Sequence, residues 1–150
     1  MEAAAKRFFS SPHFAVAGAS QDPAKFGYKL LAWYAARSLP VTPVTPSRSS
    51  IDVSSTAYTT VATPLNLDSP SNTSLSIVTP PAVTRKVLKD AKEAGVAAVW
   101  LQPGSFDEEG MNFAKREFEG AAIGGMDGRG GEGWCVLVDG DWARKAAERL

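Results

Sequence analysis

The segment FAVAGASQDPAKFGYKLLAWYAARSLPVTPVTP, Phe14–Pro46, decides the predicted fold. An apolar run without charge, His13–Ala17, predicts a strand buried on both faces. The polar turn that follows contains Asp22-Pro23, residue types that favour the start of a helix. Apolar side chains then recur at helical spacing over Phe26–Arg37, and Leu39–Val44 predicts the next strand. The segment therefore predicts a strand, a loop, a helix and a second strand.

The same alternation continues along the chain. A Ser/Thr-rich stretch, Ser47–Thr73, is the least ordered by composition and leaves room for a short strand over Tyr58–Val61. Further strands are predicted over Leu75–Thr79, Val96–Leu101, Ala121–Ile123 and Trp134–Val138, and helices over Glu2–Phe9, Ala82–Ala94, Ser105 or Asp107 to Glu119, and Trp142–Leu150. Strands separated by helices form right-handed parallel βαβ units. We therefore predict a single domain over residues 1–150, a three-layer α/β/α Rossmann-type fold with a mainly parallel five- to six-stranded sheet.

Composition excludes several classes of partner. The chain has 150 residues, 44% of them hydrophobic, and its 16 basic and 16 acidic residues give a formal net charge of zero. This balance argues against a general nucleic-acid or membrane surface. The single cysteine, Cys135, forms no internal disulfide, which favours a reducing compartment. We expect a cytoplasmic protein, with a mitochondrial location left open, that is a monomer or a homodimer.

Ligands of such folds bind beyond the carboxyl ends of the strands, so the loop after the first strand is the first candidate. It matches neither the G-x-G-x-x-G nor the G-x-x-x-x-G-K-[ST] pattern. Phosphate binding requires only free backbone N–H groups, a helix start and space for close approach. Gly18 provides a tight exit, Ser20 a hydroxyl, Lys25 a charge and Gly27 access to the first helical turn. Anion binding and a plain strand-to-helix turn both remain open on these residues.

The end of the second strand bears on the type of nucleotide. NAD-binding domains place an acidic residue there to hold the ribose, but no acid lies between Asp22 and Asp52. Arg48 occupies this exit instead. A basic side chain suits a phosphate on the ribose, as in NADP or coenzyme A. A solvated surface arginine is the alternative.

The ends of the third and fourth predicted strands, the next two strand exits, carry a proline pair and a glutamine. Pro80 and Pro81 remove two N–H donors and stiffen the chain, either as a rigid wall for an adenine or pantetheine group or as a simple strand stop. Gln102 follows the fourth strand and can hydrogen-bond a ligand amide, but it has no acid–base capacity at neutral pH.

No catalytic set is predicted. The only histidine, His13, begins the first strand, at the opposite edge of the sheet from the ligand side. No metal-ligand spacing and no G-x-S-x-G motif is present. Cys135 is either an incidental or a reactive thiol. The loop Gly124–Gly133, with Asp127, Arg129 and Glu132, is either a lid or a solvated insertion.

Four stretches, taken in order, carry a resemblance to a known family: VAGAS, KFGYKLLAWY, VTPVTPS and LSIVTPPAVTRKVLKDAKEAGVAAVWLQPGSFDEEGMNFAKREFEG. In them the chain resembles the stand-alone CoA-binding domain proteins. These are similar to the N-terminal domain of the succinyl-CoA synthetase alpha subunit, whose phosphohistidine domain is missing here. The resemblance implies a coenzyme A site. In it, the phosphates would contact Gly18, Ala19 and Ser20, Lys25 would neutralise their charge, and the adenosine would be bordered by Pro46, Ser47 and Arg48. The next part of the ligand would be lined by Val78, Thr79, Pro80 and Pro81, and Gln102 would face the pantetheine. The segment GGMDGRGGEGWC departs from the family's Asp-Arg-Cys-like ending and places Cys135 after an insertion.

We therefore expect a coenzyme A or acyl-CoA binding protein without evident catalytic machinery, more readily a binding protein than an enzyme; whether it catalyses a reaction is left open. The alternative is an NADP-dependent oxidoreductase or another nucleotide-binding regulatory protein. The missing G-x-G-x-x-G and the absence of a substrate domain within 150 residues weigh against the oxidoreductase. A scaffold that has lost its ligand and acts through protein contacts is a third hypothesis.

Overall fold

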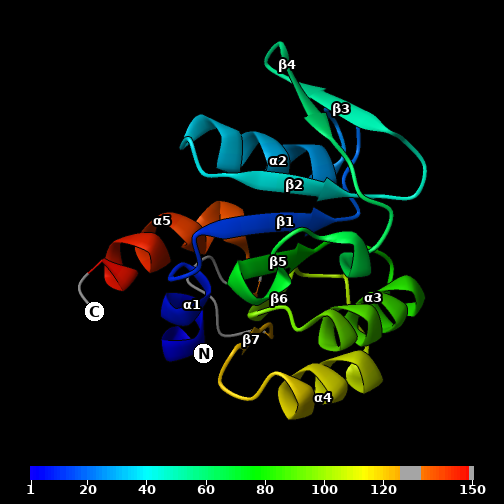
Figure 1. Ribbon diagram of the computed structural model, residues 1–150. Helices are drawn as coiled ribbons and strands as arrows, with labels where there is room; N and C mark the ends of the chain where they lie inside the picture. Colours follow the sequence, from blue (N-terminus) through cyan, green and yellow to red (C-terminus); the bar gives the residue numbers. More distant parts are fainter. Residues whose placement is uncertain (126–132, 149–150) are drawn as a thin grey trace.

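A computed structural model describes residues 1–125 and 133–148. Its centre is a five-stranded sheet in the order β2-β1-β5-β6-β7, in which every neighbouring pair is parallel (Figure 1). The strands are β1 (His13–Ala17), β2 (Val41–Val44), β5 (Thr73–Ile77), β6 (Ala98–Leu101) and β7 (Ala122–Ile123). The predicted Rossmann-type α/β architecture is therefore confirmed, with five strands in the main sheet.

Helices cover both faces of this sheet. They are α1 (Glu2–Phe8), α2 (Phe26–Ala36), α3 (Pro81–Ala94), α4 (Glu108–Glu117) and α5 (Val136–Ala147). The chain moves from β1 to β2 in one direction and from β5 through β6 to β7 in the other. Right-handed crossovers then put α2 on one face and α3 and α4 on the opposite face. Figure 1 shows α3 beside α4, while α5 contacts α1 and α2.

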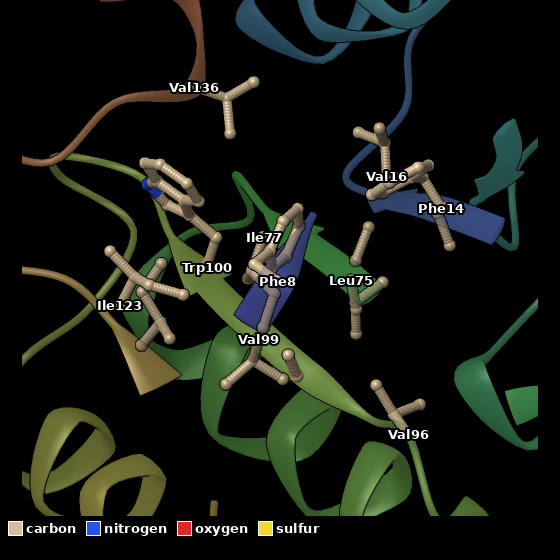
Figure 2. Close-up of a cluster of buried hydrophobic side chains, with 14 of the residues drawn as sticks. Phe8, Phe14, Val16, Leu75, Ile77, Val96, Val99, Trp100, Ile123 and Val136 are labelled. Carbon is tan, nitrogen blue, oxygen red and sulfur yellow. The ribbon is translucent and has the colours of Figure 1, made fainter. Parts of the chain in front are cut away.

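The core lies on both sides of the central strands. Every residue of β5 is buried, as is every residue of β1 except His13. Phe8 of α1 packs edge-on against Trp100 of β6, with ring centroids 5.4 Å apart (Figure 2). Trp100 is fully buried, and its indole N–H donates to the carbonyl of Trp134 at 3.1 Å. Strands buried on both faces explain the uncharged apolar runs of the sequence.

The Ser/Thr-rich stretch is more ordered than its composition predicts. It forms an antiparallel hairpin of β3 (Ser50–Val53) and β4 (Thr56–Thr59), followed by the 3₁₀ turns η1 (Pro64–Asn66) and η2 (Pro70–Asn72). The two hairpin turn residues, Ser54 and Ser55, have φ angles of 50° and 68°. Two-residue turns of this kind usually contain Asn-Gly, so the Ser-Ser sequence did not predict the hairpin.

Some predicted elements begin elsewhere in the structure: the final helix, predicted from Trp142, begins at Val136. Trp134–Val138 is not a strand, because α5 already begins at Val136. A short apolar run is compatible with either element, and here the Cys135 N–H donates to the Asp139 carboxylate at 2.9 Å, closing the first helical turn. Asp22 does not start α2; its carboxylate accepts from the Ala24 N–H at 2.9 Å in a turn that precedes the helix. No helix in the described ranges has the length and apolarity that a membrane span requires.

Candidate functional site at the carboxyl ends of the strands

The order of the sheet locates the candidate site. Strand β1 lies between β2 and β5. The strand that follows β1 in the sequence, β2, lies on one side of it, and the later strands β5, β6 and β7 lie on the other side. In open sheets of this 2-1-3-4-5 pattern, ligands bind in the crevice at that reversal, beyond the carboxyl ends of the strands. Gly18 follows β1 and Val78 follows β5, and the Val78 N–H donates to the Ala17 carbonyl at 3.0 Å. Gly18 and Val78 therefore border the place where this strand order predicts a ligand-binding crevice.

Two glycines allow the first turn of α2 to pack against the end of β1. A Cβ on Gly27 would lie 2.0 Å from the Gly18 carbonyl oxygen, which no side chain permits. Gly18 has a φ of 92°, and a Cβ there would lie 2.9 Å from the Val78 Cγ2 atom and 3.2 Å from the Thr79 backbone nitrogen. The structure thus brings four predicted site residues together: Gly18, Gly27, Val78 and Thr79.

The start of α2 is arranged to suit an anion. Ala19 is buried, and the Ser20 hydroxyl accepts from the Asp22 N–H at 3.1 Å. Lys25 is the exposed N-cap of α2, whose first turn has neither a side-chain cap nor an acidic residue. The first N–H groups of a helix lack intrahelical acceptors and attract negative charge. An anion in the crevice would meet these N–H groups and the Lys25 ammonium.

The second exit places a cation at the edge of the crevice. Pro46, Ser47 and Arg48 are exposed in the connection from β2 to β3. The Thr45 and Ser47 hydroxyls share a hydrogen bond of 3.0 Å. The Arg48 Nε donates to the Ser50 carbonyl at 3.1 Å, and no bond from its terminal nitrogens is found in the described part of the chain. The guanidinium is therefore held against the hairpin with its outer N–H groups free.

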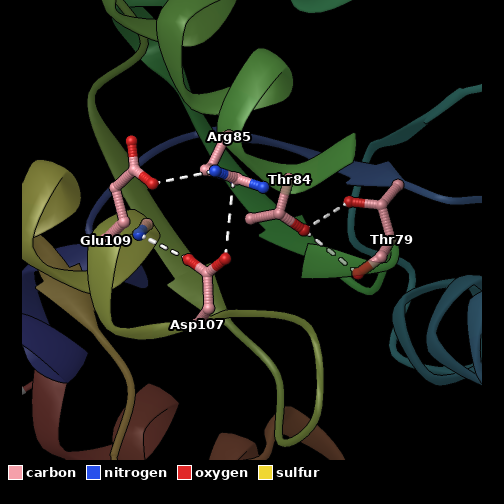
Figure 3. A network of polar contacts seen from close by, with 6 residues as sticks. Thr79, Thr84, Arg85, Asp107 and Glu109 are labelled. Atoms are coloured by element: carbon pink, nitrogen blue, oxygen red, sulfur yellow. Dashed lines mark hydrogen bonds and ion pairs between the residues drawn. The ribbon is translucent and has the colours of Figure 1, made fainter. Parts of the chain in front are cut away.

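The third exit is a rigid corner. Thr79 and the fully buried Thr84 share a hydrogen bond of 2.6 Å between their hydroxyls, and the Thr84 hydroxyl also contacts the Thr79 carbonyl at 3.0 Å (Figure 3). Pro80 is the N-cap of α3 and Pro81 its first residue. Proline before and at the helix start fixes the backbone that borders Gly18. Thr84 was missed by sequence analysis, because a threonine in a helical pattern gives no sign of a partner.

The fourth exit holds an incompletely paired amide. The fully buried Gln102 accepts from the Val136 N–H through Oε1 at 3.1 Å, which ties β6 to the start of α5. Its Nε2 has no hydrogen-bond partner among residues 1–125 and 133–148. A buried donor without an acceptor costs about 1–3 kcal/mol. Gln102 is therefore suited to donate to a ligand carbonyl, and its backbone N–H donates to the Ile77 carbonyl at the end of β5 at 3.0 Å.

The remaining candidates from the sequence are the single histidine, the single cysteine and the glycine-rich loop. His13 is exposed at the amino end of β1. Cys135 is buried as the N-cap of α5. Asp127, Arg129 and Glu132 of the Gly124–Gly133 loop lie outside the described residues. Within the described ranges, no group of three His, Cys, Asp or Glu side chains could hold a metal ion.

A groove of about 840 Å³ lies elsewhere, between the outer surfaces of α3 and α4. Its charges are largely paired with one another. Arg85 lies 2.8 Å from Glu109 and 3.6 Å from Asp107, and Lys86 lies 2.5 Å from Asp90 (Figure 3 shows the Arg85 contacts). The Arg85 pairs join α3 to the start of α4 and the Lys86–Asp90 pair lies within α3, so these charges are structural and do not point to a ligand.

Several solved structures are similar to this chain. A conserved hypothetical protein from Pyrococcus furiosus is 30% identical, with a TM-score of 0.62, and the match covers 70% of this chain and 86% of that one. A protein from Thermus thermophilus is 23% identical over 78% of this chain and 86% of that one, with a TM-score of 0.66. A hypothetical protein from Pyrococcus horikoshii OT3 is 16% identical over 78% and 80%, with a TM-score of 0.68. The last two show the fold alone.

No match was found among curated proteins. The family model described as "CoA binding domain" matches residues 12–127, a range that contains every exit described above. The chain therefore belongs to the CoA binding domain family.

Proposed function

We propose that this protein binds coenzyme A, free or acylated, in the crevice beyond the carboxyl ends of β1, β2, β5 and β6. The observation on which the proposal depends most is the contact of Gly18 with Gly27 and Thr79, next to a helix start without cap or acid. Such a start can receive a diphosphate on its backbone N–H groups. The family match supports coenzyme A over NADP as the ligand.

In this proposal each exit contacts a different part of the ligand. Gly18, Ala19 and Ser20 contact the diphosphate, and Lys25 neutralises it. Pro46, Ser47 and Arg48 border the adenosine, with Arg48 on the ribose phosphate. The remaining lining comes from the third and fourth exits: Val78, Thr79, Pro80, Pro81 and Gln102. The role is binding without catalysis, in a cytoplasmic protein.

Calorimetric titration tests this function directly. The purified protein is titrated with coenzyme A, dephospho-CoA, NAD and NADP in the presence of a reductant, which excludes disulfide formation. We expect coenzyme A to bind most tightly and dephospho-CoA more weakly. A preference for NADP would favour the oxidoreductase instead, and no heat with any ligand would overturn the proposal.

Arg48→Ala then tests the ribose phosphate assignment. A charge-assisted hydrogen bond is worth about 1.5–3 kcal/mol, so the affinity for coenzyme A should fall by about 10- to 100-fold. The affinity for dephospho-CoA should change little. Arg116→Ala removes an equal charge from the exposed surface of α4 and serves as the control. Equal losses for both ligands would contradict the role of Arg48.

A further inference from the structure

Gln21 makes an unusual pair of contacts with the hairpin. Its Nε2 donates to the Asp52 carbonyl at 2.9 Å, and its Oε1 accepts from the Asp52 N–H at 2.8 Å. One side-chain amide thus bonds both backbone groups of a residue 31 positions away. Gln21 belongs to the loop between β1 and α2, directly after Ser20. The loop proposed to hold the diphosphate is therefore joined to β3.

Apart from the Gln21–Asp52 pair, few hydrogen bonds join the hairpin to the rest of the described residues. It is not part of the five-stranded sheet. After β4, Val61 pairs with β2: its N–H donates to the Pro43 carbonyl at 3.0 Å and its carbonyl accepts from the Thr45 N–H at 2.9 Å. On the β3 side, Ile51 and Val53 are buried and β3 contacts α2. Apolar burial sets the distance between β3 and the rest of the fold, whereas two directional bonds set its register and orientation.

Arg48 is hydrogen-bonded to residues of the hairpin and its flanks. Its Nε donates to the Ser50 carbonyl at 3.1 Å, and its own carbonyl accepts from the Thr60 hydroxyl. The Thr60 N–H donates to the Ser49 carbonyl at 3.1 Å. The position of the guanidinium relative to Gly18 and Ser20 is therefore set from two sides: by the bond from the Gly18 N–H to the Val44 carbonyl at 3.2 Å, which holds the end of β2, and by the contact that holds β3 to the loop. In the described residues, the polar contact between β3 and the loop is the Gln21–Asp52 pair.

We infer that Gln21 is a positioning residue for ligand specificity. By fixing β3 to the loop after β1, it holds Arg48 at a set distance from the diphosphate position, so that a phosphate on the ribose is selected over an unmodified ribose. The inference rests on the proposed function and adds a residue that neither the motifs nor the exits identify. Gln21 itself need not touch the ligand.

The test compares the ratio of the dissociation constants for coenzyme A and dephospho-CoA in variants. Gln21→Met keeps the side-chain length and removes both bonds. Asp52→Ala is the matched control, because Asp52 takes part through its backbone alone and its side chain is exposed. We expect Gln21→Met to reduce the preference for coenzyme A by about five- to twentyfold, and Asp52→Ala to leave it unchanged within about twofold.

A double-mutant cycle separates positioning from general stability. If Gln21 acts through Arg48, Gln21→Met should cause no further loss of preference in the Arg48→Ala background. Thermal unfolding of each variant confirms folding, and amide hydrogen exchange at residue 52 reports the lost bond. If Gln21→Met fails to fold, Gln21→Asn takes its place, since its shorter side chain cannot reach both backbone groups.

Each outcome decides the inference. An unchanged preference in Gln21→Met, or an equal weakening of both ligands, would overturn it while the proposed function stands. Additive losses in the cycle would also overturn it, because Gln21 would then act independently of Arg48. If the wild-type protein binds no coenzyme A, both the proposed function and this inference fail.

Discussion

At the scale of single residues, Gly27 shows how two opposing effects meet at one position. It is the second residue of α2, where alanine would favour the helix by about 1 kcal/mol. The Gly18 carbonyl oxygen, however, would lie 2.0 Å from the new Cβ. That oxygen belongs to the backbone at the end of a buried strand and has no freedom to move aside. The steric effect therefore outweighs the helix propensity.

We predict that Gly27→Ala lowers the free energy of unfolding by about 1–3 kcal/mol, the usual range for overpacking, and weakens coenzyme A binding. Urea denaturation and calorimetry measure the two effects. Gly95→Ala is the control: its φ of 85° makes the substitution strained, but no atom lies within 4 Å. It should cost about 1–2 kcal/mol and leave binding unchanged. A stabilised Gly27→Ala protein would contradict the packing argument.

Tyr34 provides a second prediction at this scale. It is fully buried and shares a hydrogen bond of 2.8 Å with Ser76. Burial raises the pKa of its hydroxyl well above 10.0, and the bond with Ser76 offsets only part of this effect. Because the unfolded chain releases this proton more readily, the contribution of Tyr34 is complete below pH 10 and is lost as the pH rises further.

Tyr34→Phe should therefore be less stable than the wild type by about 1–3 kcal/mol at neutral pH, since the Ser76 hydroxyl loses its partner. The difference should narrow above about pH 10, where only the wild type loses stability through this group. Denaturant unfolding of both proteins across alkaline pH measures it. A gap that is constant to high pH would show that Tyr34 titrates alike in both states.

At the scale of elements, α5 is joined to α2 by packing and by charge. A Cβ on Gly140 would lie 2.5 Å from the Trp33 ring, so the helices meet at a glycine. Beside this contact, Arg37 donates to both carboxylate oxygens of Asp141, at 2.7 Å and 2.8 Å. The hydrogen bond from Arg37, together with the charges of Arg37 and Arg144, lowers the pKa of Asp141. The pair is largely exposed, so its contribution to stability is small.

Asp141→Asn should lower the free energy of unfolding by no more than about 1 kcal/mol at neutral pH. Because the pKa of Asp141 is lowered in the folded protein, this contribution is present above the unfolded pKa of about 3.8 and disappears as the pH falls through the folded value. Unfolding measured from pH 7 to pH 2 tests the expectation. Glu148→Gln, which removes an exposed carboxylate near the end of the same helix, should show no such change. A difference that persists at pH 2 would contradict it.

At the scale of the whole molecule, the candidate site is assembled from segments far apart in the chain. Its borders come from the ends of four strands, and the Gln21–Asp52 pair adds the hairpin. None of these segments forms the site alone, so the ligand should bind the folded protein and not the unfolded chain. Binding and global stability are then linked.

Coenzyme A at a concentration of 100 times its dissociation constant should stabilise the protein by about 2.7 kcal/mol. For a chain of this length the unfolding midpoint should rise by about 5–10 °C. Differential scanning calorimetry measures the shift, and dephospho-CoA at the same concentration should give a smaller one. An equal shift with inorganic pyrophosphate would indicate anion binding without nucleotide selectivity.

The sequence by itself determined the alternation of strands and helices and the loops that follow the main strands. Burial can be predicted from local sequence. A strand covered on both faces needs an uncharged apolar run, as in His13–Ala17, and a helix that packs on a sheet needs apolar side chains at helical spacing. The helix end at Ala94 and the helix start at Asp107 are equally local signals, and both are confirmed. The candidate residues of the site could be named because each follows a predictable strand.

Only the tertiary structure decided how those loops are joined. The hairpin of β3 and β4 depends on a Ser-Ser turn with positive φ angles that its composition does not announce. The start of α5, the bond from Val136 to Gln102 and the pairing of Gln21 with Asp52 each connect segments far apart in sequence. Their side chains are common polar and apolar types, whose partners are chosen by proximity in the folded chain. The apolar pattern of a segment predicts which of its faces is buried. The specific contacts between distant segments form only when the helices and strands pack together.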